Sequence, residues 1–231
     1  MSGPSLGPVL GATPDVVAFD ALETLFSLSA LEPRLAEAGG GDPTILETWL
    51  ARLTRDGLAL GLAGDWRTFN EVAKAALGSL LPDATDSALE HVVAGFTELD
   101  AHPDSGPAMG RAVQGARVVV VTNAGAPATC KLLERAGLDA FVEAVVSADD
   151  AGAWKPAADA YLHAAEIASV PPERLALVSA HPWDVHGARA AGLLTGWCNR
   201  TGSHFPETFQ EADVHGPDLL EVVEGFLSFT P

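Results

Sequence analysis

The sequence has few of the residues that build disulfide or metal scaffolds. Its 231 residues include two cysteines, Cys130 and Cys198, with no CxxC pair and no cysteine–histidine spacing of the zinc type. This excludes a disulfide scaffold and a structural zinc site, and it is typical of a reducing compartment, so we expect a cytoplasmic protein. Apolar runs stay well short of the roughly 20 residues that cross a bilayer, and residues 1–14 lack the basic start of a secretory signal.

Positive charge is also scarce, with 13 Lys and Arg against 31 Asp and Glu, for a formal net charge of -18. A field of this sign repels nucleic acid and anionic membranes, so we expect neither as a partner. It also slows anionic substrates, so a site for an acid needs donors of its own. Apolar residues make up 48% of the chain, which excludes general disorder.

Strands and helices are expected to alternate along most of the chain. Runs of apolar β-formers predict strands at 16–19, 117–122, 141–147, 175–179 and 194–198, with a short sixth at 213–215. Helical spacing of apolar residues predicts helices at 28–38, 43–64, 66–80 and 86–99, with Asp86 as the N-cap of the last, and further helices at 127–136, 157–167, 182–191 and 217–229. This alternation predicts an α/β fold with a doubly wound parallel sheet.

A block of nearly pure helix interrupts this alternation directly after the first predicted strand. We therefore expect an α/β core domain of residues 15–27 and 102–231, and an inserted helical cap domain of residues 28–101. In an open parallel sheet, ligands bind beyond the carboxyl ends of the strands. The cap is accordingly predicted to lie over that edge.

Polar side chains follow four of the predicted strands. Because the carboxyl ends of parallel strands meet at one edge of a sheet, we expect these side chains to converge. A carboxylate at that edge serves as a nucleophile, a metal ligand or a cap for the next turn. The four groups are Asp20 with Thr24, Thr122 with Asn123, Lys155, and Ser179 with His181 and Asp184.

These stretches resemble the motifs of the haloacid dehalogenase (HAD) superfamily, and those of its 2-haloacid dehalogenase (haloacid dehalogenase type II) branch most closely. The resemblance implies a HAD-like Rossmannoid core with a cap, and hydrolysis of a carbon–halogen bond through an aspartyl ester. It extends from about residue 16 to residue 205. The motifs are Asp-Ala-Leu-Glu-Thr-Leu-Phe from Asp20, Val-Thr-Asn-Ala-Gly from Val121, Trp-Lys-Pro from Trp154, Val-Ser-Ala-His-Pro-Trp-Asp from Val178, and Trp-Cys-Asn-Arg-Thr-Gly from Trp197.

The resemblance also implies a role for each site residue. Asp20 would be the nucleophile, Lys155 would keep it ionised, and Asp184 would pair with Lys155 and help to position water. Tyr161 and Ser179 would order Lys155 and Asp184, and His181 would act as a neutral base toward water. The implied catalytic set is thus Asp20, Lys155, Asp184, Ser179 and His181, and the implied substrate-facing set is Thr24, Thr122, Asn123, Tyr161, Leu50 and Trp183.

Simpler interpretations of three of these residues stay open. Tyr161 is also explained as an aromatic that packs a helix, Thr122 as a strand-end cap and His181 as a turn histidine. Asp20 has the strongest functional interpretation, because all four polar groups are present together.

Two positions depart from the magnesium-dependent phosphatases of the superfamily. Leu22 stands where those enzymes carry an acid/base aspartate, and Ala180 stands where they carry a metal-binding carboxylate. A leucine cannot protonate a leaving oxygen, and hard cations need oxygen ligands. We therefore expect no metal and no other cofactor.

Three positions also depart from the dehalogenase branch. Leu50 stands where the branch carries the arginine that holds the departing halide, Glu23 replaces the usual glycine, and His181 replaces an asparagine. Arg52 and Arg55 lie on the same predicted helix, but they point about 200° and 140° away from Leu50, so neither is an obvious substitute.

These departures leave the substrate open beyond a small organic acid. A magnesium-dependent phosphatase-like hydrolase of a small phosphorylated metabolite stays as one alternative. A small-acid binding protein without turnover is the other. A homodimer is a further expectation.

Overall fold

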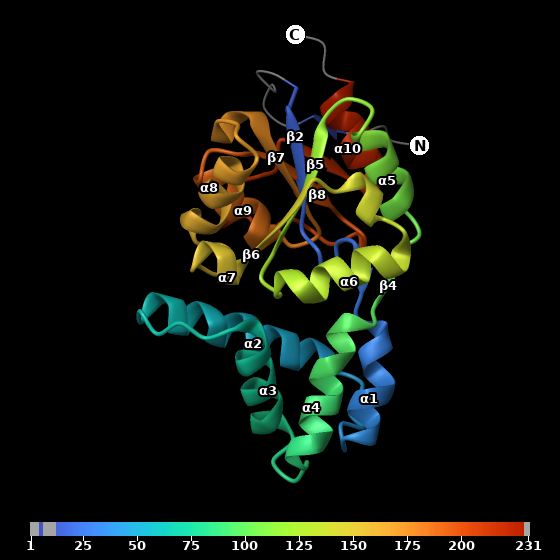
Figure 1. Ribbon diagram of the computed structural model, residues 1–231, viewed down its shortest axis with the longest axis vertical. Helices are drawn as coiled ribbons and strands as arrows, with labels where there is room; N and C mark the ends of the chain where they lie inside the picture. Colours follow the sequence, from blue (N-terminus) through green and yellow to red (C-terminus); the bar gives the residue numbers. More distant parts are fainter. Residues whose placement is uncertain (1–4, 7–12, 229–231) are drawn as a thin grey trace.

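The computed structural model, which describes residues 5–6 and 13–228, has a parallel sheet with helices on both faces (Figure 1). The strand order is β1-β9-β8-β7-β2-β5-β6, and all neighbours from β9 to β6 are parallel, whereas β1 pairs with β9 antiparallel. This confirms the predicted fold class. The strands of this sheet are β1 (Ser5–Leu6), β2 (Val16–Phe19), β5 (Arg117–Thr122), β6 (Ala144–Ser147), β7 (Leu175–Ser179), β8 (Leu194–Cys198) and β9 (Val214–Gly216).

Strand β2 is buried on both faces because it lies between two layers of helices. Val17 and Phe19 belong to one apolar cluster and Val16 and Ala18 to another, as expected when successive side chains point to opposite faces. One face is covered by α5 (Ser105–Ala112), α6 (Ala126–Ala136) and α10 (Leu219–Leu227), and the other by α7 (Ala148–Ala151), α8 (Ala158–Ile167) and α9 (Pro182–Ala190) (Figure 1).

Four further helices gather beyond the carboxyl ends of the strands (Figure 1). They are α1 (Glu32–Glu37), α2 (Ile45–Leu62), α3 (Phe69–Leu80) and α4 (Asp86–Ala94). The chain leaves the core through β3 (Phe26–Ser27) and returns through β4 (Asp100–Ala101), and these two short strands pair antiparallel. We propose that the helices between them form the cap expected over residues 28–101.

The structure differs from several predicted boundaries. Helix α4 is capped by Thr85, whose hydroxyl accepts from the Ala88 amide at 3.2 Å, so Asp86 is not the N-cap but the first helical residue. Helix α3 begins at Phe69 because Thr68 and Glu71 form a capping box. The strand predicted at 141–147 begins at Ala144, after a short 3-10 turn, and α4 ends at Ala94, before another.

Two predictions reach beyond the described part of the chain. The interpretation of residues 1–14 falls mostly outside it, and so does the last residue of the helix predicted at 217–229. Within residues 5–6 and 13–228, no helix is both long and apolar enough to cross a membrane.

A close contact joins α2 to the loop that precedes Lys155. A Cβ atom at Gly57 would lie 2.6 Å from the ring of Trp154, so only glycine allows this approach. The Trp154 ring also stacks on Phe69, with centroids 6.0 Å apart, and its indole N–H donates to the Arg67 carbonyl at 3.2 Å. Trp154 therefore packs against the helical layer directly beside a predicted site residue.

Candidate active site

Asp20 follows β2 at the carboxyl edge of the sheet and is only 5% exposed. Its Oδ1 accepts from Lys155 Nζ at 2.7 Å, and its Oδ2 accepts from the Thr24 hydroxyl at 2.7 Å. The Thr24 oxygen in turn accepts from the Ala180 amide at 2.9 Å. Thr24 is fully buried and holds Asp20, which differs from the expectation that it faces the substrate.

The Lys155 ammonium lies between two carboxylates and has all three of its N–H donors in use. It donates to Asp20 and Asp184 at 2.7 Å each and to the Val121 carbonyl at 3.0 Å. Burial opposes its charge, but the carboxylates of Asp184 and then Asp20 outweigh burial and raise the pKa of Lys155 above its usual value. Lys155 is therefore a cation that holds the two carboxylates in place.

Asp184 is fully buried and is oriented from a second side by Tyr161. The Tyr161 hydroxyl donates to Asp184 Oδ1 at 2.6 Å. Burial and the Asp184 charge raise the pKa of Tyr161 well above its ordinary value, so the hydroxyl keeps its proton. The structure thus places Tyr161 on Asp184 and away from the substrate-facing positions. Ser179 accepts from the His181 amide at 3.1 Å, and so it orders His181 instead of the expected Lys155 or Asp184.

Asn123 holds the backbone of Lys155 through both atoms of its amide. Its Oδ1 accepts from the Lys155 amide at 2.8 Å, and its Nδ2 donates to the Lys155 carbonyl at 3.2 Å. The Thr122 hydroxyl oxygen accepts from the Ala124 amide at 3.0 Å, as a strand-end cap would. Both Thr122 and Asn123 also line the cavity described next, so they combine a local structural bond with a position beside the ligand space.

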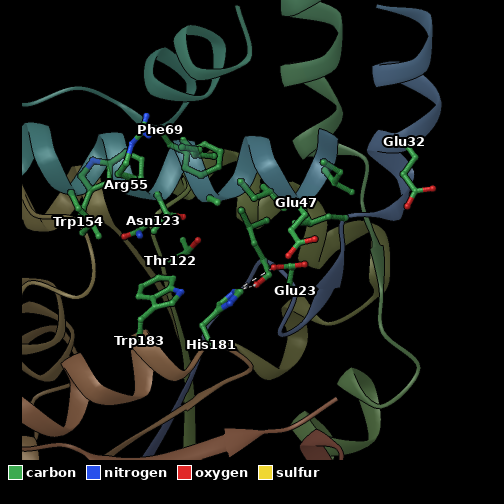
Figure 2. A pocket seen from close by; sticks show the side chains of 18 of the residues that line it. Glu23, Glu32, Glu47, Arg55, Phe69, Thr122, Asn123, Trp154, His181 and Trp183 are labelled. Atoms are coloured by element: carbon green, nitrogen blue, oxygen red, sulfur yellow. Dashed lines mark hydrogen bonds and ion pairs between the residues drawn. The ribbon is translucent and has the colours of Figure 1, made fainter. Parts of the chain in front are cut away.

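A cavity of about 790 Å³ lies between this edge of the sheet and helix α2 (Figure 2). Leu50 and Trp183, for which the resemblance implies a substrate-facing position, both line it. Most of its wall is apolar, and the charged or titratable residues of the wall are Glu23, Glu32, Glu47, Arg55 and His181. Its volume falls within the usual range for small-molecule sites, roughly 300 to 1,000 Å³.

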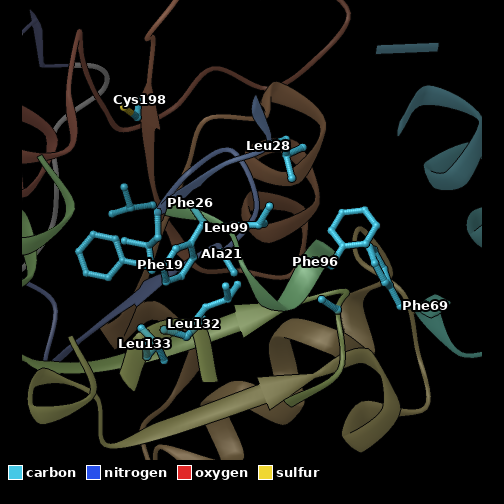
Figure 3. Close-up of a cluster of buried hydrophobic side chains, with 14 of the residues drawn as sticks. Phe19, Ala21, Phe26, Leu28, Phe69, Phe96, Leu99, Leu132, Leu133 and Cys198 are labelled. Atoms are coloured by element: carbon cyan, nitrogen blue, oxygen red, sulfur yellow. The ribbon is translucent and has the colours of Figure 1, made fainter. Parts of the chain in front are cut away.

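The cavity wall includes residues that the sequence argument did not select. Arg55, expected to point away from Leu50, lines the same cavity near Phe69 and Trp154 (Figure 2). Positions 47, 51, 54, 55 and 58 of α2 all contribute, and their spacing of three and four residues is the signal that would have found this face. Phe69 extends the wall into the core, because its ring packs edge-on against Phe96 with centroids 4.9 Å apart (Figure 3).

Glu23 and His181 line the cavity close to Asp20, since His181 Nε2 lies 3.7 Å from Asp20 Oδ2. Glu23 has φ 60, the left-handed conformation that costs a side-chain-bearing residue roughly 1–2 kcal/mol. His181 stacks on Trp183 with centroids 5.3 Å apart, and its Nε2 lies 3.1 Å from the Leu22 carbonyl oxygen. A carbonyl only accepts, so this nitrogen carries a hydrogen.

The residues present fit a divalent metal poorly. Within the described ranges, no three His, Cys, Asp or Glu side chains come together as a metal site would require. The two carboxylates that a cation would need, Asp20 and Asp184, both bind the Lys155 ammonium, and Ala180 offers no side-chain oxygen. The absence of a metal cofactor stays a prediction.

A buried strand-end carboxylate, a lysine and a second carboxylate lie together beside the cavity, an arrangement that suits a hydrolase with an aspartate nucleophile. The chain belongs to the haloacid dehalogenase-like hydrolase family, whose model matches residues 14–192. Haloacetate dehalogenase H-2 of Moraxella sp. (strain B) is 26% identical to it, over 90% of this chain and 96% of that protein.

Solved structures show the same fold. The L-2-haloacid dehalogenase RSc1362 has a TM-score of 0.86 at 24% identity, and the match covers 94% of this chain and all of the other. The L-2-haloacid dehalogenase of Xanthobacter autotrophicus with chloropropionic acid covalently bound has a TM-score of 0.80 at 20% identity, with 91% and 97% covered.

Proposed function

We propose that this protein is a 2-haloacid dehalogenase-like hydrolase that works through an ester on Asp20 and needs no metal ion. The observation that carries the proposal is the Asp20 carboxylate, bound to Lys155 at 2.7 Å beside an apolar cavity. The ammonium favours the ionised carboxylate, which is the nucleophilic form. The curated relative named above is a haloacetate dehalogenase, and one structural neighbour holds chloropropionic acid covalently, which supports this chemistry.

The proposed reaction has two steps. An Asp20 oxygen attacks the carbon that bears the halogen, and the halide leaves with the bonding electrons. A water molecule positioned by Asp184 then adds to the ester carbonyl, and the Cγ–O bond breaks to release the hydroxy acid and the free carboxylate. Overall, one water is consumed, and one halide and one proton are released.

The cavity favours a larger acid than the simplest 2-haloacids. Leu50 adds apolar surface, and the cavity of about 790 Å³ holds the liquid volume of roughly 26 waters at about 30 Å³ each. Because Lys155 has its donors in use, a substrate carboxylate needs positive charge from elsewhere, and the cation on the cavity wall is Arg55, whose guanidinium also pairs with Asp56 at 2.7 Å. We expect weak activity on short 2-haloacids and better acceptance of a bulkier, more apolar acid.

Single turnover in oxygen-18 water tests the proposal. The protein is mixed with 2-chloropropionate or a longer 2-halocarboxylate, and the Asp20 peptide is analysed by mass spectrometry. We expect the label to enter the Asp20 carboxylate before it enters product, and Asp20→Asn to fold normally without turnover. Label that enters the product first, or near-normal activity of Asp20→Asn, would overturn the proposal.

Chelation tests the metal-free part of the proposal. Because Leu22 and Ala180 supply no acid/base or ligand carboxylate, activity should survive exhaustive EDTA treatment. Loss of activity that magnesium alone restores would favour the phosphatase-like alternative. We also propose a cytoplasmic location and a homodimer. A molar mass from light scattering that corresponds to a monomer would contradict the homodimer.

A further inference from the structure

The imidazole of His181 faces oxygen acceptors from three residues of the nucleophile loop. Its Nε2 lies 3.1 Å from the Leu22 carbonyl, 3.7 Å from Asp20 Oδ2 and 3.9 Å from Glu23 Oε2. A nitrogen surrounded by acceptors carries a hydrogen and donates it. This orientation suits His181 as a proton donor to Asp20, whereas the family resemblance implies that it acts as a base toward water.

Glu23 approaches His181 from an unusual backbone conformation. With φ 60, its amide donates to the Phe26 carbonyl at 2.7 Å, and its side chain extends toward the imidazole. A residue with a Cβ rarely adopts this conformation, and such outliers gather at functional sites. Figure 2 shows the Glu23 and His181 side chains on the same side of the cavity.

The two oxygens of Asp20 have different neighbours. Oδ1 is bound to Lys155, so it is suited to become the ester carbonyl, whose negative charge in the hydrolysis step the ammonium stabilises. Oδ2 accepts from Thr24 and lies nearer to His181, which lines the cavity. It is therefore the oxygen that becomes the ester oxygen and leaves with the product.

We propose that His181 is the catalytic acid for ester hydrolysis and that Glu23 is its positioning residue, an inference that rests on the proposed function. Water adds to Cγ and gives one proton to Asp184, and the Cγ–Oδ2 bond then breaks. His181, as an imidazolium, passes its Nε2 proton to Oδ2 as that oxygen leaves in the product hydroxyl, and it becomes a neutral imidazole. Asp184 and the regenerated Asp20 carboxyl each then lose a proton, and His181 regains one proton. The net result is one proton released to solvent for each halide ion released.

A second cavity gives His181 a route to proton exchange with solvent. It has a volume of about 390 Å³, and Glu23, Leu28 and His181 line both cavities, so these three residues lie between them. Its other lining residues are largely polar and include Asn199, Thr201 and Ser203. His181 can therefore regain a proton without displacing the ligand in the apolar cavity.

The kinetic test separates ester formation from ester hydrolysis. Rapid-quench mass spectrometry follows the Asp20 ester with 2-chloropropionate in wild type, His181→Gln, Glu23→Gln and Glu23→Gly. We expect ester formation to change less than threefold, and hydrolysis to slow about a hundredfold for His181→Gln and about tenfold for both Glu23 variants. Glu23→Gly relieves the backbone conformation, so a defect equal to that of Glu23→Gln assigns the effect to the carboxylate.

The matched control is Glu37→Gln, because Glu37 lies 3.8 Å from the exposed imidazole of His91 and outside both cavities. It should leave both steps unchanged. A second substrate, dichloroacetate, forms an ester whose alcohol is more acidic and needs less protonation. The His181→Gln defect should therefore shrink with dichloroacetate, which a purely structural role would not produce. Equal slowing of both steps, or an undiminished defect with dichloroacetate, would overturn the proposal.

A measurement without substrate keeps this inference separate from the proposed function. In ¹⁵N-histidine-labelled protein, the His181 signal is identified by its loss in His181→Gln. We expect Nε2 to carry hydrogen in wild type, and its hydrogen to exchange faster with solvent in Glu23→Gln. An Nε2 without hydrogen, or an unchanged exchange rate in Glu23→Gln, refutes the arrangement. Failure of ester formation in wild type, with the expected NMR result, refutes only the proposed function.

Discussion

Replacing Lys155 with methionine should convert the centre of the site from a stable triad into two facing carboxylates. Each of Asp20 Oδ1 and Asp184 Oδ2 lies 2.7 Å from Nζ, so the two oxygens are at most about 5.4 Å apart. At an effective dielectric constant of about 20, two unit charges at that distance repel by about 3 kcal/mol. Loss of one member of a buried ion pair costs about 3–5 kcal/mol, and we expect Lys155→Met to lose about that much unfolding free energy at pH 7.

The pH dependence of this loss gives the sharper test. In folded Lys155→Met, burial and the neighbouring like charge favour uptake of a proton by the carboxylate pair as the pH falls, whereas the two carboxylates are apart and solvated in the unfolded chain. The folded variant then binds more protons than the unfolded one, so its stability rises as the pH falls. In wild type, the pKa of Lys155 is raised in the folded state. Its contribution to the unfolding free energy is therefore complete below the ordinary lysine pKa and is lost only as the pH rises above that value. Lowering the pH from 7 to 5 gives no gain in stability from this group.

Urea unfolding followed by circular dichroism, at pH 7 and pH 5, measures both effects. Adding Asp184→Asn to Lys155→Met removes the repulsion and should restore most of the lost stability. The matched control is Lys131→Met, an exposed lysine on α6, which should change stability by less than about 0.5 kcal/mol. A loss below about 1 kcal/mol for Lys155→Met that does not vary with pH would refute this reasoning, because the two carboxylates would then not both be charged in the native protein.

Three further predictions concern other parts of the fold. Tyr161→Phe removes the 2.6 Å hydrogen bond to buried Asp184 and should cost about 1–3 kcal/mol in urea unfolding; no loss would mean that water replaces the hydroxyl. Burial raises the pKa of Cys198 to about 12, so at pH 9 a thiol reagent should modify the exposed Cys130 far faster than Cys198. Because the unfolded chain loses the Cys198 proton at lower pH than the folded protein, the contribution of Cys198 to the unfolding free energy should decline as the pH rises from 9 toward 12. Equal rates for the two thiols would contradict this burial. Leu50→Arg should raise turnover of 2-chloropropionate in rapid-quench kinetics, and a lower rate would show that another group already holds the halide.

The meeting of Asp20 and Asp184 could be predicted because topology alone brings them together, whereas the role of Lys155, which lies beyond β6 and α7, came from the motif resemblance. Asp20 follows one strand and Asp184 lies just beyond another, and β2 and β7 are parallel neighbours, so their carboxyl ends share one edge. The hydrogen-bond partners could not be predicted. Thr24 has the spacing of a ligand contact, but its hydroxyl is held between Asp20 and the Ala180 amide, an arrangement that depends on β7.

The wall of the cavity was harder to predict than its base. The angle between Arg55 and Leu50 on an ideal helix excluded Arg55, but a long arginine side chain reaches round a helix face, and several residues of that face border the cavity. The residue type of Glu23 does not indicate its left-handed backbone, because that conformation is typical of glycine, asparagine and aspartate; only the glycine usual at this position in the dehalogenase branch pointed to it. The edge strand at Ser5–Leu6 is two residues long, too short for any periodic pattern.

The contact between Trp154 and helix α2 links the helical layer above the cavity to the residue that binds Asp20. Trp154 touches Gly57, Phe69 and the Arg67 carbonyl, and the next residue along the chain, Lys155, binds the nucleophile. The peptide group between residues 154 and 155 is planar and stiff. A change in the packing of α2 and α3 against Trp154 would therefore disturb the backbone of Lys155, whose ammonium Asp20 depends on.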